Sequence, residues 1–390
     1  MVKRIVNISK SHSFFLFGPR GSGKTTLLNH HFSDDKCLHI DLLDYQYESL
    51  LYKDPNQLIQ IIESQKSVSW VIIDEIQKNP KLLDVVHKLT LNKKYKFALT
   101  GSSARKLKRQ SANLLAGRAF NFKCHPLTSL ELGKNFNLNE ALKFGLLPAI
   151  SSLSTADKRH FLRSYIDTYF KEEIVAEQIV RNLRPFRNFL DVAAQMNGKI
   201  LNINHIARDV GVDHSTVQNY FEILEDTLVG LMLEPYHQSI RKRQRQASKF
   251  YYFDSGVVSA LNKTLESQLV QSTIEYGQAF EHFVILEFRK YRDYYKPDWS
   301  LSYLRTKDDA EIDLIIERPK SPTLAIEIKS TNKISELSKN AFNTFSALAK
   351  DIGKVESFLL SQDPIERKID HVWCLPWQKG LRESGIIDLD

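Results

Sequence analysis

The 390-residue sequence contains few cysteines and no long apolar segment. Its cysteines, Cys37, Cys124 and Cys374, are far apart and odd in number. They match neither the close spacing of a metal site nor a disulfide framework, so we expect a reducing compartment, the cytoplasm. No stretch approaches ~18 consecutive apolar residues, and the N-terminus has no apolar signal region. We therefore expect neither secretion nor a membrane span.

Internal repeats and low-complexity tracts are also absent. The apolar fraction of 42% is that of a globular protein, and 390 residues predict two or three domains. The formal net charge is +8 and the pI is about 9.1. This charge favours an anionic partner, most commonly nucleic acid, although it also fits simple solubility.

A glycine-rich motif, G-x-x-x-x-G-K-T, occupies residues 18–25 after the apolar run 14–17. A strand, a glycine-rich loop and a helix in this order are typical of a phosphate-binding loop, whose backbone N–H groups surround an anion. Lys24 would reach the β- and γ-phosphates of ATP, and the Thr25 hydroxyl would bind Mg²⁺. The predicted nucleotide-binding residues are Gly18, Pro19, Arg20, Gly21, Ser22, Gly23, Lys24, Thr25 and Thr26.

A second apolar run, residues 71–73, ends in Asp74 and Glu75. We expect Asp74 to hold Mg²⁺ and Glu75 to polarise the attacking water; the alternative is an ordinary solvated strand end. A third run, 95–100, leads into Gly101, Ser102 and Ser103. Thr100, Ser102 and Ser103 are candidates to hydrogen-bond the γ-phosphate or the water, or else they cap the next helix.

Residues 1–150 alternate short strands with longer helices, which predicts an α/β fold with a mostly parallel sheet. We expect a strand at 38–41 and helices at 55–63 and 82–89. Arg118 follows a basic stretch, 105–109. It is a candidate arginine finger for a neighbouring subunit's γ-phosphate, with a surface arginine in a turn as the alternative.

The region 156–261 is predicted to be mainly helical. Residues 203–210, a turn with a glycine, and residues 215–226 fit a helix-turn-helix, with Asp213 as the N-cap of the second helix. The exposed face of that helix carries short polar groups suited to a DNA groove. These residues are Ser215, Thr216, Gln218 and Asn219.

A basic segment follows, close to Lys249 and the aromatic residues 250–252. It predicts a hairpin wing whose cations contact DNA phosphates; the alternative is a solvated loop on a protein-binding scaffold. The wing cations are Arg241, Lys242, Arg243 and Arg245.

The C-terminal part predicts a helix at 277–291, carrying Glu281 and Glu287, and strands at 311–316 and 324–329. Asp313 and Glu327 would share a metal ion, Lys329 would orient the attacking water, and Glu281 would complete the shell. The alternative is an edge strand with an outward ion pair between Glu327 and Lys329.

Together these motifs resemble the prokaryotic AAA+-type P-loop ATPases that carry a C-terminal DUF4143 region. The resemblance rests on residues 18–25, 74–77, 100–103, 115–118, 126–127, 310–313 and 326–330. It implies an AAA+ ATPase domain with a lid at 1–150, a helical linker and winged helix at 151–262, and a PD-(D/E)xK nuclease-like α/β domain, of restriction-endonuclease type, at 263–390. In one departure from AAA+ proteins, residues 126–150 contain no second-sensor arginine.

The resulting hypothesis is a homo-oligomeric ATPase that acts on DNA, for example a branched-DNA motor of recombination or repair. Two alternatives stay open. One is an ATP-regulated, Mg²⁺-dependent nuclease, and the other is a slow ATPase switch that binds protein partners.

Overall fold

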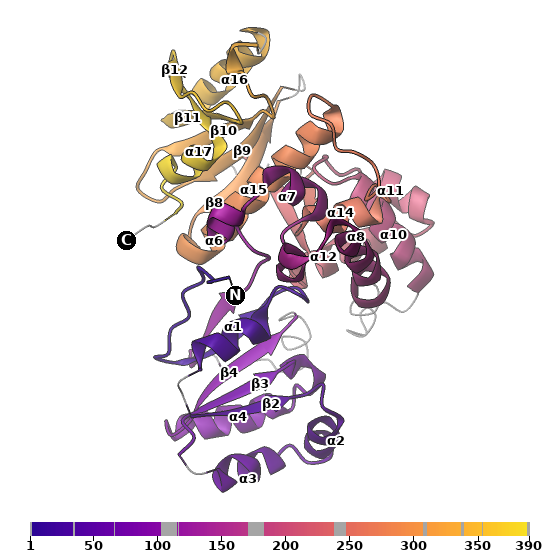
Figure 1. Ribbon diagram of the computed structural model, residues 1–390, viewed down its shortest axis with the longest axis vertical. Coiled ribbons are helices and arrows are strands. Elements are labelled where there is room, and N and C mark those ends of the chain that lie inside the picture. The colour runs from indigo at the N-terminus through magenta and orange to yellow at the C-terminus, as the bar shows by residue number, and fades with distance from the viewer. Residues whose placement is uncertain are drawn as a thin grey trace. The chain divides into compact units, whose positions relative to one another are not determined.

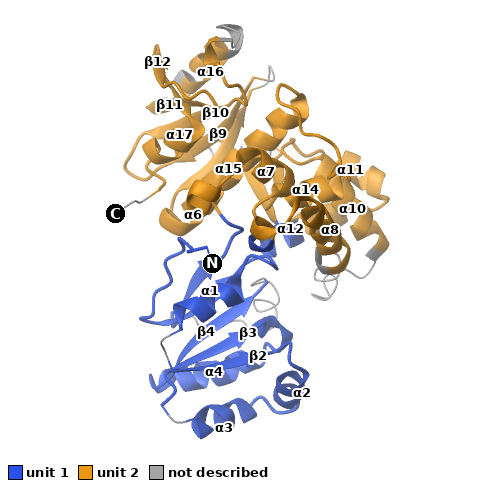
Figure 2. Ribbon diagram, in the orientation of Figure 1, with its two compact units in different colours: residues 1–127, 147–149, 222–229 blue, residues 128–146, 150–221, 230–390 orange. Residues whose placement is uncertain are grey.

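The computed structural model describes residues 2–33, 36–65, 67–102, 115, 117–170, 183–237, 247–306, 310–336, 339–352 and 354–387. The chain forms two compact units (Figure 2). Unit 1 comprises residues 1–127, 147–149 and 222–229, and unit 2 comprises residues 128–146, 150–221 and 230–390. The predicted domain boundaries at 150 and 262 stay predictions.

Unit 1 is built on a parallel sheet of five strands in the order β2-β3-β4-β1-β5. The strands are β1 (Ser13–Phe17), β2 (Cys37–Asp41), β3 (Trp70–Asp74), β4 (Lys96–Gly101) and β5 (Ala119–Lys123). Its helices are α1 (Lys24–His31), α2 (Tyr45–Lys53), α3 (Gln57–Ser64) and α4 (Leu82–Leu91), with a 3₁₀ turn η1 (Ile76–Lys78). The predicted α/β fold with a parallel sheet is therefore confirmed.

The central strands of unit 1, β1, β3 and β4, are buried on both faces, and their side chains divide between two apolar cores. Phe15 and Phe17 of β1 belong to one core, together with residues of α3 and α4. Phe14 and Leu16 belong to the other core, together with Leu28 of α1. Figure 1 shows α1 on one side of this sheet and α3 and α4 on the other. Continuous apolar runs such as 14–17 form strands here because both of their faces meet a helix layer.

The strand order of unit 1 determines where polar residues meet. Strand β4 lies between β1 and β3, and all three strands run in the same direction. Their carboxyl ends therefore share one edge of the sheet. In open α/β sheets this edge is where ligands bind.

Unit 2 combines a helical part with an eight-stranded sheet, as Figure 1 shows. Its helices are α6 (Ser129–Leu132), α7 (Leu138–Phe144), α8 (Thr155–Ser164), α10 (Leu183–Gln195), α11 (Ile203–Val210), α12 (His214–Asp226, which ends in unit 1), α14 (Ser255–Leu261), α15 (Ile274–Tyr295), α16 (Lys339–Asp351) and α17 (Trp377–Glu383). Shorter segments are η2 (Gly133–Asn135), η3 (Pro148–Ser152), η4 (Tyr165–Phe170, a π-helix) and η5 (Ile334–Glu336).

The sheet of unit 2 is mixed and has the order β12-β13-β11-β10-β9-β8-β6-β7. Its strands are β6 (Gly230–Pro235), β7 (Lys249–Tyr252), β8 (Ser300–Arg305), β9 (Glu311–Glu317), β10 (Thr323–Ile328), β11 (Val355–Ser361), β12 (Arg367–Ile369) and β13 (Val372–Pro376). Glu234 and Pro235 of β6 pair in parallel with β8, while the rest of β6 pairs antiparallel with β7. The two predicted wing strands therefore continue the sheet that carries Asp313 and Glu327.

Helices cover both faces of this sheet. Helix α16 packs against β9 and β11 in a core that contains Phe345 and Leu359. Helix α15 packs against β10, and α17 packs against β11 and β13. The two helices also contact each other, with the rings of Phe283 and Trp377 5.1 Å apart. Among the described residues, no helix is long and apolar enough to cross a membrane.

Candidate functional site

The phosphate-type loop between β1 and α1 closes as its glycines predict. Gly21 and Gly23 have φ values of 76° and 89°, in the region that favours glycine. A Cβ atom on Gly18 would lie 2.2 Å from the Cys124 carbonyl oxygen, so only glycine fits at the start of the loop. The loop is thus packed tightly against the strand next to it.

The interior of this loop is polar. Lys24 is 6% exposed and donates from Nζ to the carbonyl oxygens of Gly18 (2.7 Å) and Pro19 (3.3 Å). The Ser22 hydroxyl oxygen is buried and has no hydrogen-bond partner among the described residues. An ammonium group and an unsatisfied buried hydroxyl at the N-terminus of α1 suit a phosphate group.

Thr25 in the first turn of α1 meets Asp74 and Thr100 at the carboxyl ends of β3 and β4. The Thr25 hydroxyl donates to one carboxylate oxygen of Asp74 (2.6 Å), and the buried Thr100 hydroxyl donates to the other. The Glu75 N–H in turn donates to the Thr100 hydroxyl oxygen (3.3 Å). Thr100 therefore acts as a positioning residue for the acid strand.

Glu75 and Ser102 are linked through Gln77, a residue of the 74–77 motif for which the sequence indicated no role of its own. Gln77 Nε2 donates to the Glu75 carboxylate and to the Ser102 hydroxyl oxygen (3.2 Å). Glu75 has a φ of 58°, a left-handed conformation that costs a residue with a Cβ about 1 kcal/mol or more. Such strain persists only where the surroundings impose it, and here η1 and Gln77 do so.

Arg4 is a second residue that sequence reasoning missed. Its guanidinium donates to the carbonyl oxygens of Ser22 (2.7 Å) and His125 (2.6 Å). The Cys124 thiol also donates to the Ser22 carbonyl (3.4 Å). Neither residue belongs to a spaced motif, so no signal in the sequence marks them as supports of the loop.

In unit 2, four acidic residues and two lysines gather around β7, β9, β10 and α15. We call this set the carboxylate cluster: Lys249, Glu281, Glu311, Asp313, Glu327 and Lys329. Lys249 Nζ contacts Glu311 and lies 3.3 Å from Glu281 Oε1, while Lys329 Nζ lies 2.5 Å from Glu327 Oε1. The Tyr251 hydroxyl donates to Glu281 (2.7 Å), and the Ile328 N–H donates to Asp313 (2.7 Å).

The cluster brings together all four residues predicted for the nuclease-like site. Burial, followed by the charge of Asp313, raises the pKa of Glu281 to about 7. The same two causes raise the pKa of Glu327 to about 8. Burial opposes the charge on Lys249, but Glu281, Asp313 and Glu311 hold its pKa above the ordinary lysine value. Closely spaced buried carboxylates of this kind mark a candidate functional site.

The carboxylates of the cluster pair with Lys249 and Lys329 and do not converge on a single point. In the described part of the chain, no three His, Cys, Asp or Glu side chains are placed so as to hold a metal ion. One feature does suit a cation: Glu327 Oε2 is buried and has no hydrogen-bond partner among the residues described. Strand β10 lies between β9 and β11, so the alternative of an edge strand is wrong. The metal ligands Asp313 and Glu327 stay predictions.

The two helices α11 and α12 occupy the predicted positions, and Asp213 caps α12 by accepting the Thr216 N–H (2.8 Å). The Ser215 and Thr216 hydroxyls also donate to Asp213, at 2.6 and 2.7 Å, and these bonds lower its pKa. Gln218 and Asn219 are exposed. Two of the four predicted DNA-contacting side chains therefore take part in capping the helix.

Three family models match the chain. The first is described as an AAA domain and covers residues 10–133. The second and third are domains of unknown function, DUF8612 at residues 135–268 and DUF4143 at residues 276–379. This chain is an AAA-domain protein with a C-terminal DUF4143 domain. The AAA model covers the loop and the acid strand described above, which are the parts that a nucleotide-binding domain requires.

The relatives found carry no assigned activity. An uncharacterized protein of Mycobacterium tuberculosis is 27% identical over 320 residues, covering 81% of this chain and 70% of the relative. An uncharacterized protein of Methanocaldococcus jannaschii is 25% identical over 352 residues, covering 83% and 76%.

Among solved structures, AMPPCP-bound DnaA from Aquifex aeolicus is similar, with a TM-score of 0.30, 14% identity, and coverage of 56% of this chain and 83% of that chain. A STAND protein from Pyrococcus horikoshii has a TM-score of 0.22, 13% identity, and coverage of 75% and 48%.

Within the AAA domain, Arg118 lies far from the domain's own phosphate loop. It immediately precedes β5, whose first residue pairs with Ser13 at the start of β1, whereas the loop follows the end of β1. Its guanidinium contacts His87 of α4. Arg118 therefore does not act on the nucleotide of its own subunit, and its role across a subunit boundary stays a prediction.

Several predicted residues lie outside the described residues. In the AAA domain these are Ser103 and the basic stretch 105–109. In the predicted wing they are Arg241, Lys242, Arg243 and Arg245. Lys249, read from the sequence as part of the basic wing, is 3% exposed and bonded to carboxylates, so it is not a surface cation.

Proposed function

We propose that the AAA domain binds ATP with Mg²⁺ and hydrolyses it. The observation that carries this proposal is the linked set of hydrogen bonds joining Thr25, Asp74, Thr100 and Glu75 at one edge of the sheet. The loop side chains Lys24 and Ser22 fit phosphate oxygens, and Thr25 and Asp74 would hold Mg²⁺, which neutralises developing charge on the phosphates when bound.

Each residue then has a separate task. The loop N–H groups and Lys24 position the phosphates for in-line attack. Glu75, held through Gln77, would orient the water and accept its proton. Thr100 fixes the orientation of Asp74, and Ser102 anchors Gln77. The assignment of Glu75 and Ser102 to these roles is part of the proposal.

We further propose that ATP turnover serves an action on DNA, with branched DNA as one candidate substrate. The support is the order of elements in the DUF8612 region: α10, α11, α12, then the β6–β7 hairpin, with residues 197 and 200 bridging to β7. This order is that expected of a winged helix. The net charge of +8 supports a polyanionic partner.

The deciding experiment is ATP turnover by the purified protein alone and with single-stranded, duplex and four-way-junction DNA. The Lys24→Ala variant serves as the blank. We expect turnover that DNA stimulates, and the best stimulant identifies the substrate. Turnover that no DNA changes would contradict the DNA role and favour a switch that binds protein partners. No difference between wild type and Lys24→Ala would contradict ATP hydrolysis itself.

A second candidate activity is metal-dependent cleavage of phosphodiesters at the carboxylate cluster. The observation that favours it is the convergence of Glu281, Asp313, Glu327 and Lys329 from three separate elements. Asp313 and Glu327 would hold Mg²⁺, which polarises the phosphate and activates water when bound. Lys329 would stabilise the charge that develops on the phosphorus oxygens.

The test is nicking of supercoiled DNA with Mg²⁺ or Mn²⁺. Nicking that is lost in Lys329→Ala and retained in Lys24→Ala would support cleavage at the cluster. Nicking that survives Lys329→Ala would assign it to a contaminant and contradict this proposal.

A further inference from the structure

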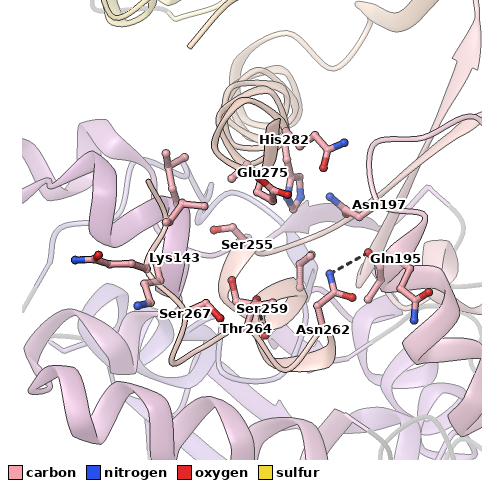
Figure 3. Close-up of a pocket in the computed structure, with 17 residues that line it drawn as sticks. Lys143, Gln195, Asn197, Ser255, Ser259, Asn262, Thr264, Ser267, Glu275 and His282 are labelled. Atoms are coloured by element: carbon pink, nitrogen blue, oxygen red, sulfur yellow. Dashed lines mark hydrogen bonds between the residues drawn. The ribbon is translucent and has the colours of Figure 1, made fainter. Parts of the chain in front are cut away.

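A cavity of about 230 Å³ opens in unit 2 among α7, α10, α14 and α15 (Figure 3). It lies within and just beyond the DUF8612 region and meets the first turns of α15. Its walls are apolar in part, with Leu142, Val258 and Leu269, and otherwise carry hydroxyl, amide and imidazole groups together with the charged side chains of Lys143 and Glu275. Apolar walls with a few fixed polar groups are typical of a small-molecule site.

The hydrogen bonds around the cavity determine what its polar groups can offer to a ligand. The Ser255 hydroxyl donates to the Ala141 carbonyl (2.5 Å), and the Thr264 hydroxyl donates to the Ser259 carbonyl (3.2 Å). A hydroxyl has one proton, so both groups have only lone pairs left for a ligand.

Asn262 and His282 are constrained in the same way. Asn262 Nδ2 donates to the Ala194 carbonyl (3.3 Å), the bond drawn in Figure 3, and this fixes Oδ1 as the free acceptor. His282 Nε2 lies 2.6 Å from the Tyr252 carbonyl oxygen, which can only accept, so Nε2 carries the proton. His282 is 2% exposed, and burial lowers its pKa to about 4. Its Nδ1 is therefore a lone-pair acceptor at neutral pH.

Asn197 is constrained in the opposite sense. Its Oδ1 accepts the Tyr252 N–H (2.8 Å), which leaves its amide nitrogen to donate. The cavity thus presents several acceptors and at least one donor. A ligand that matches this pattern has an amino group next to an unprotonated ring nitrogen. Adenine and cytosine have such an edge, whereas uracil and thymine carry a carbonyl and an N–H in its place.

We propose that this cavity binds the aminated edge of a nucleobase, either from a free nucleoside or from an unstacked base of a single strand. The apolar walls would contact the faces of the ring. Two of the acceptors of Ser255, Asn262 and His282 would receive the two amino protons, and the Asn197 amide would donate to the ring nitrogen. This inference does not depend on ATP hydrolysis or on cleavage at the carboxylate cluster.

The test is calorimetric titration of the full chain with cytidine and, separately, with uridine. These pyrimidine nucleosides differ at the edge in question and lack the phosphates that the AAA domain recognises. Anisotropy with labelled oligo(dC) and oligo(dT) forms a second arm. We expect a preference of at least about tenfold for the cytosine ligand, since each 1.4 kcal/mol of discrimination is a factor of ten.

Asn262→Leu should abolish most of this preference, and Ala279→Leu, which adds volume to the cavity wall, should weaken binding of both ligands. Asn204→Leu, an exposed change on α11 outside the cavity, is the matched control and should bind as wild type does. Thermal unfolding of each variant checks that unit 2 stays folded.

Cytidine binding that depends on Asn262 would support a free nucleoside as the source. An Asn262-dependent preference for oligo(dC) without cytidine binding would support a base within a strand. Equal affinity for cytosine and uracil or thymine ligands, absence of binding to all four, or a preference unchanged in Asn262→Leu would overturn the proposal.

Discussion

Lys249 is the residue whose replacement most directly tests the description of unit 2. Its side chain is 4% exposed and pairs with Glu281 and Glu311, whose side chains keep 22% and 27% of their exposure. Lys249→Met keeps most of the apolar stem and removes the charge. Breaking a buried ion pair costs about 3–5 kcal/mol, because the partner charge stays buried without compensation.

Water reaches both carboxylates in part, so we place the loss for Lys249→Met at the lower end, about 3 kcal/mol. For a unit of this size that corresponds to a fall in melting temperature of about 6–12 °C. The loss in the free energy of unfolding can be measured by urea unfolding followed by tryptophan fluorescence, since Trp299, Trp373 and Trp377 all lie in unit 2.

Lys199→Met is the matched control, because Lys199 is exposed and lines the same small cavity as Lys249. Its stability should stay within about 0.5 kcal/mol of wild type. The double variant Lys249→Met/Glu281→Gln removes both charges and should recover at least about 1 kcal/mol relative to the sum of the single changes. A loss below about 1 kcal/mol for Lys249→Met, or additive effects in the double variant, would refute the reasoning.

Three further predictions follow from single contacts. Thr100→Val removes the hydrogen bond from the Thr100 hydroxyl to Asp74. Steady-state ATP turnover should then fall about 10–100-fold, while nucleotide affinity, measured by titration, changes little. Unchanged turnover would contradict the positioning role of Thr100. Gly145→Ala should lower the free energy of unfolding, measured in urea, by at least about 3 kcal/mol, because the φ of Gly145 is 75° and a Cβ would lie 1.8 Å from Asp254 Oδ1. Gly211 has the same φ but no atom within 4 Å of the added Cβ, so Gly211→Ala should cost only about 1–2 kcal/mol. Equal losses in the two variants would contradict the steric account. The pKa of His282 is about 4 in the folded state, below its unfolded value, so the unfolded state binds the proton first as the pH falls. The free energy of unfolding of unit 2 should therefore decrease by roughly 3 kcal/mol between about pH 6.5 and pH 4. This decrease should be absent from His282→Gln when the stability of both proteins is compared at each pH.

The phosphate loop and the acid strand could be predicted from the sequence because their chemistry depends on local spacing. Eight consecutive residues define the loop, and the acids follow the buried strand directly. Strand β3 (Trp70–Asp74) and helix α4 (Leu82–Leu91) lie within two residues of the predicted bounds, since a continuous apolar run and a 3.6-residue period identify them. The roles of Arg4 and Gln77 could not be predicted, because they depend on contacts with Ser22, His125 and Ser102, which are distant in the sequence.

In the carboxylate cluster of unit 2, too, local patterns could be predicted from the sequence and long-range contacts could not. Glu327 and Lys329 form an ion pair, as the alternation of side chains along a strand predicts for residues two positions apart. Lys249 was read as part of a basic wing because arginines and aromatic residues surround it in the sequence. Its burial depends on the pairing of β6 with β8, which joins residues 68 positions apart, such as Glu234 and Ser302, and leaves no local pattern.

This pairing constrains any function of unit 2. Strand β7 supplies Lys249 and Tyr251 to the carboxylate cluster, and the chain segment that joins β6 to β7 carries the predicted DNA-contacting arginines. The two flanking strands are hydrogen-bonded into the sheet that holds Asp313 and Glu327, so a displacement of the hairpin must break ladder hydrogen bonds or move Lys249 relative to Glu281. Winged-helix and nuclease-like parts that were independent modules could each move without affecting the other. In this chain, a ligand that displaced the β6–β7 hairpin would therefore also change the position of Lys249 relative to Glu281.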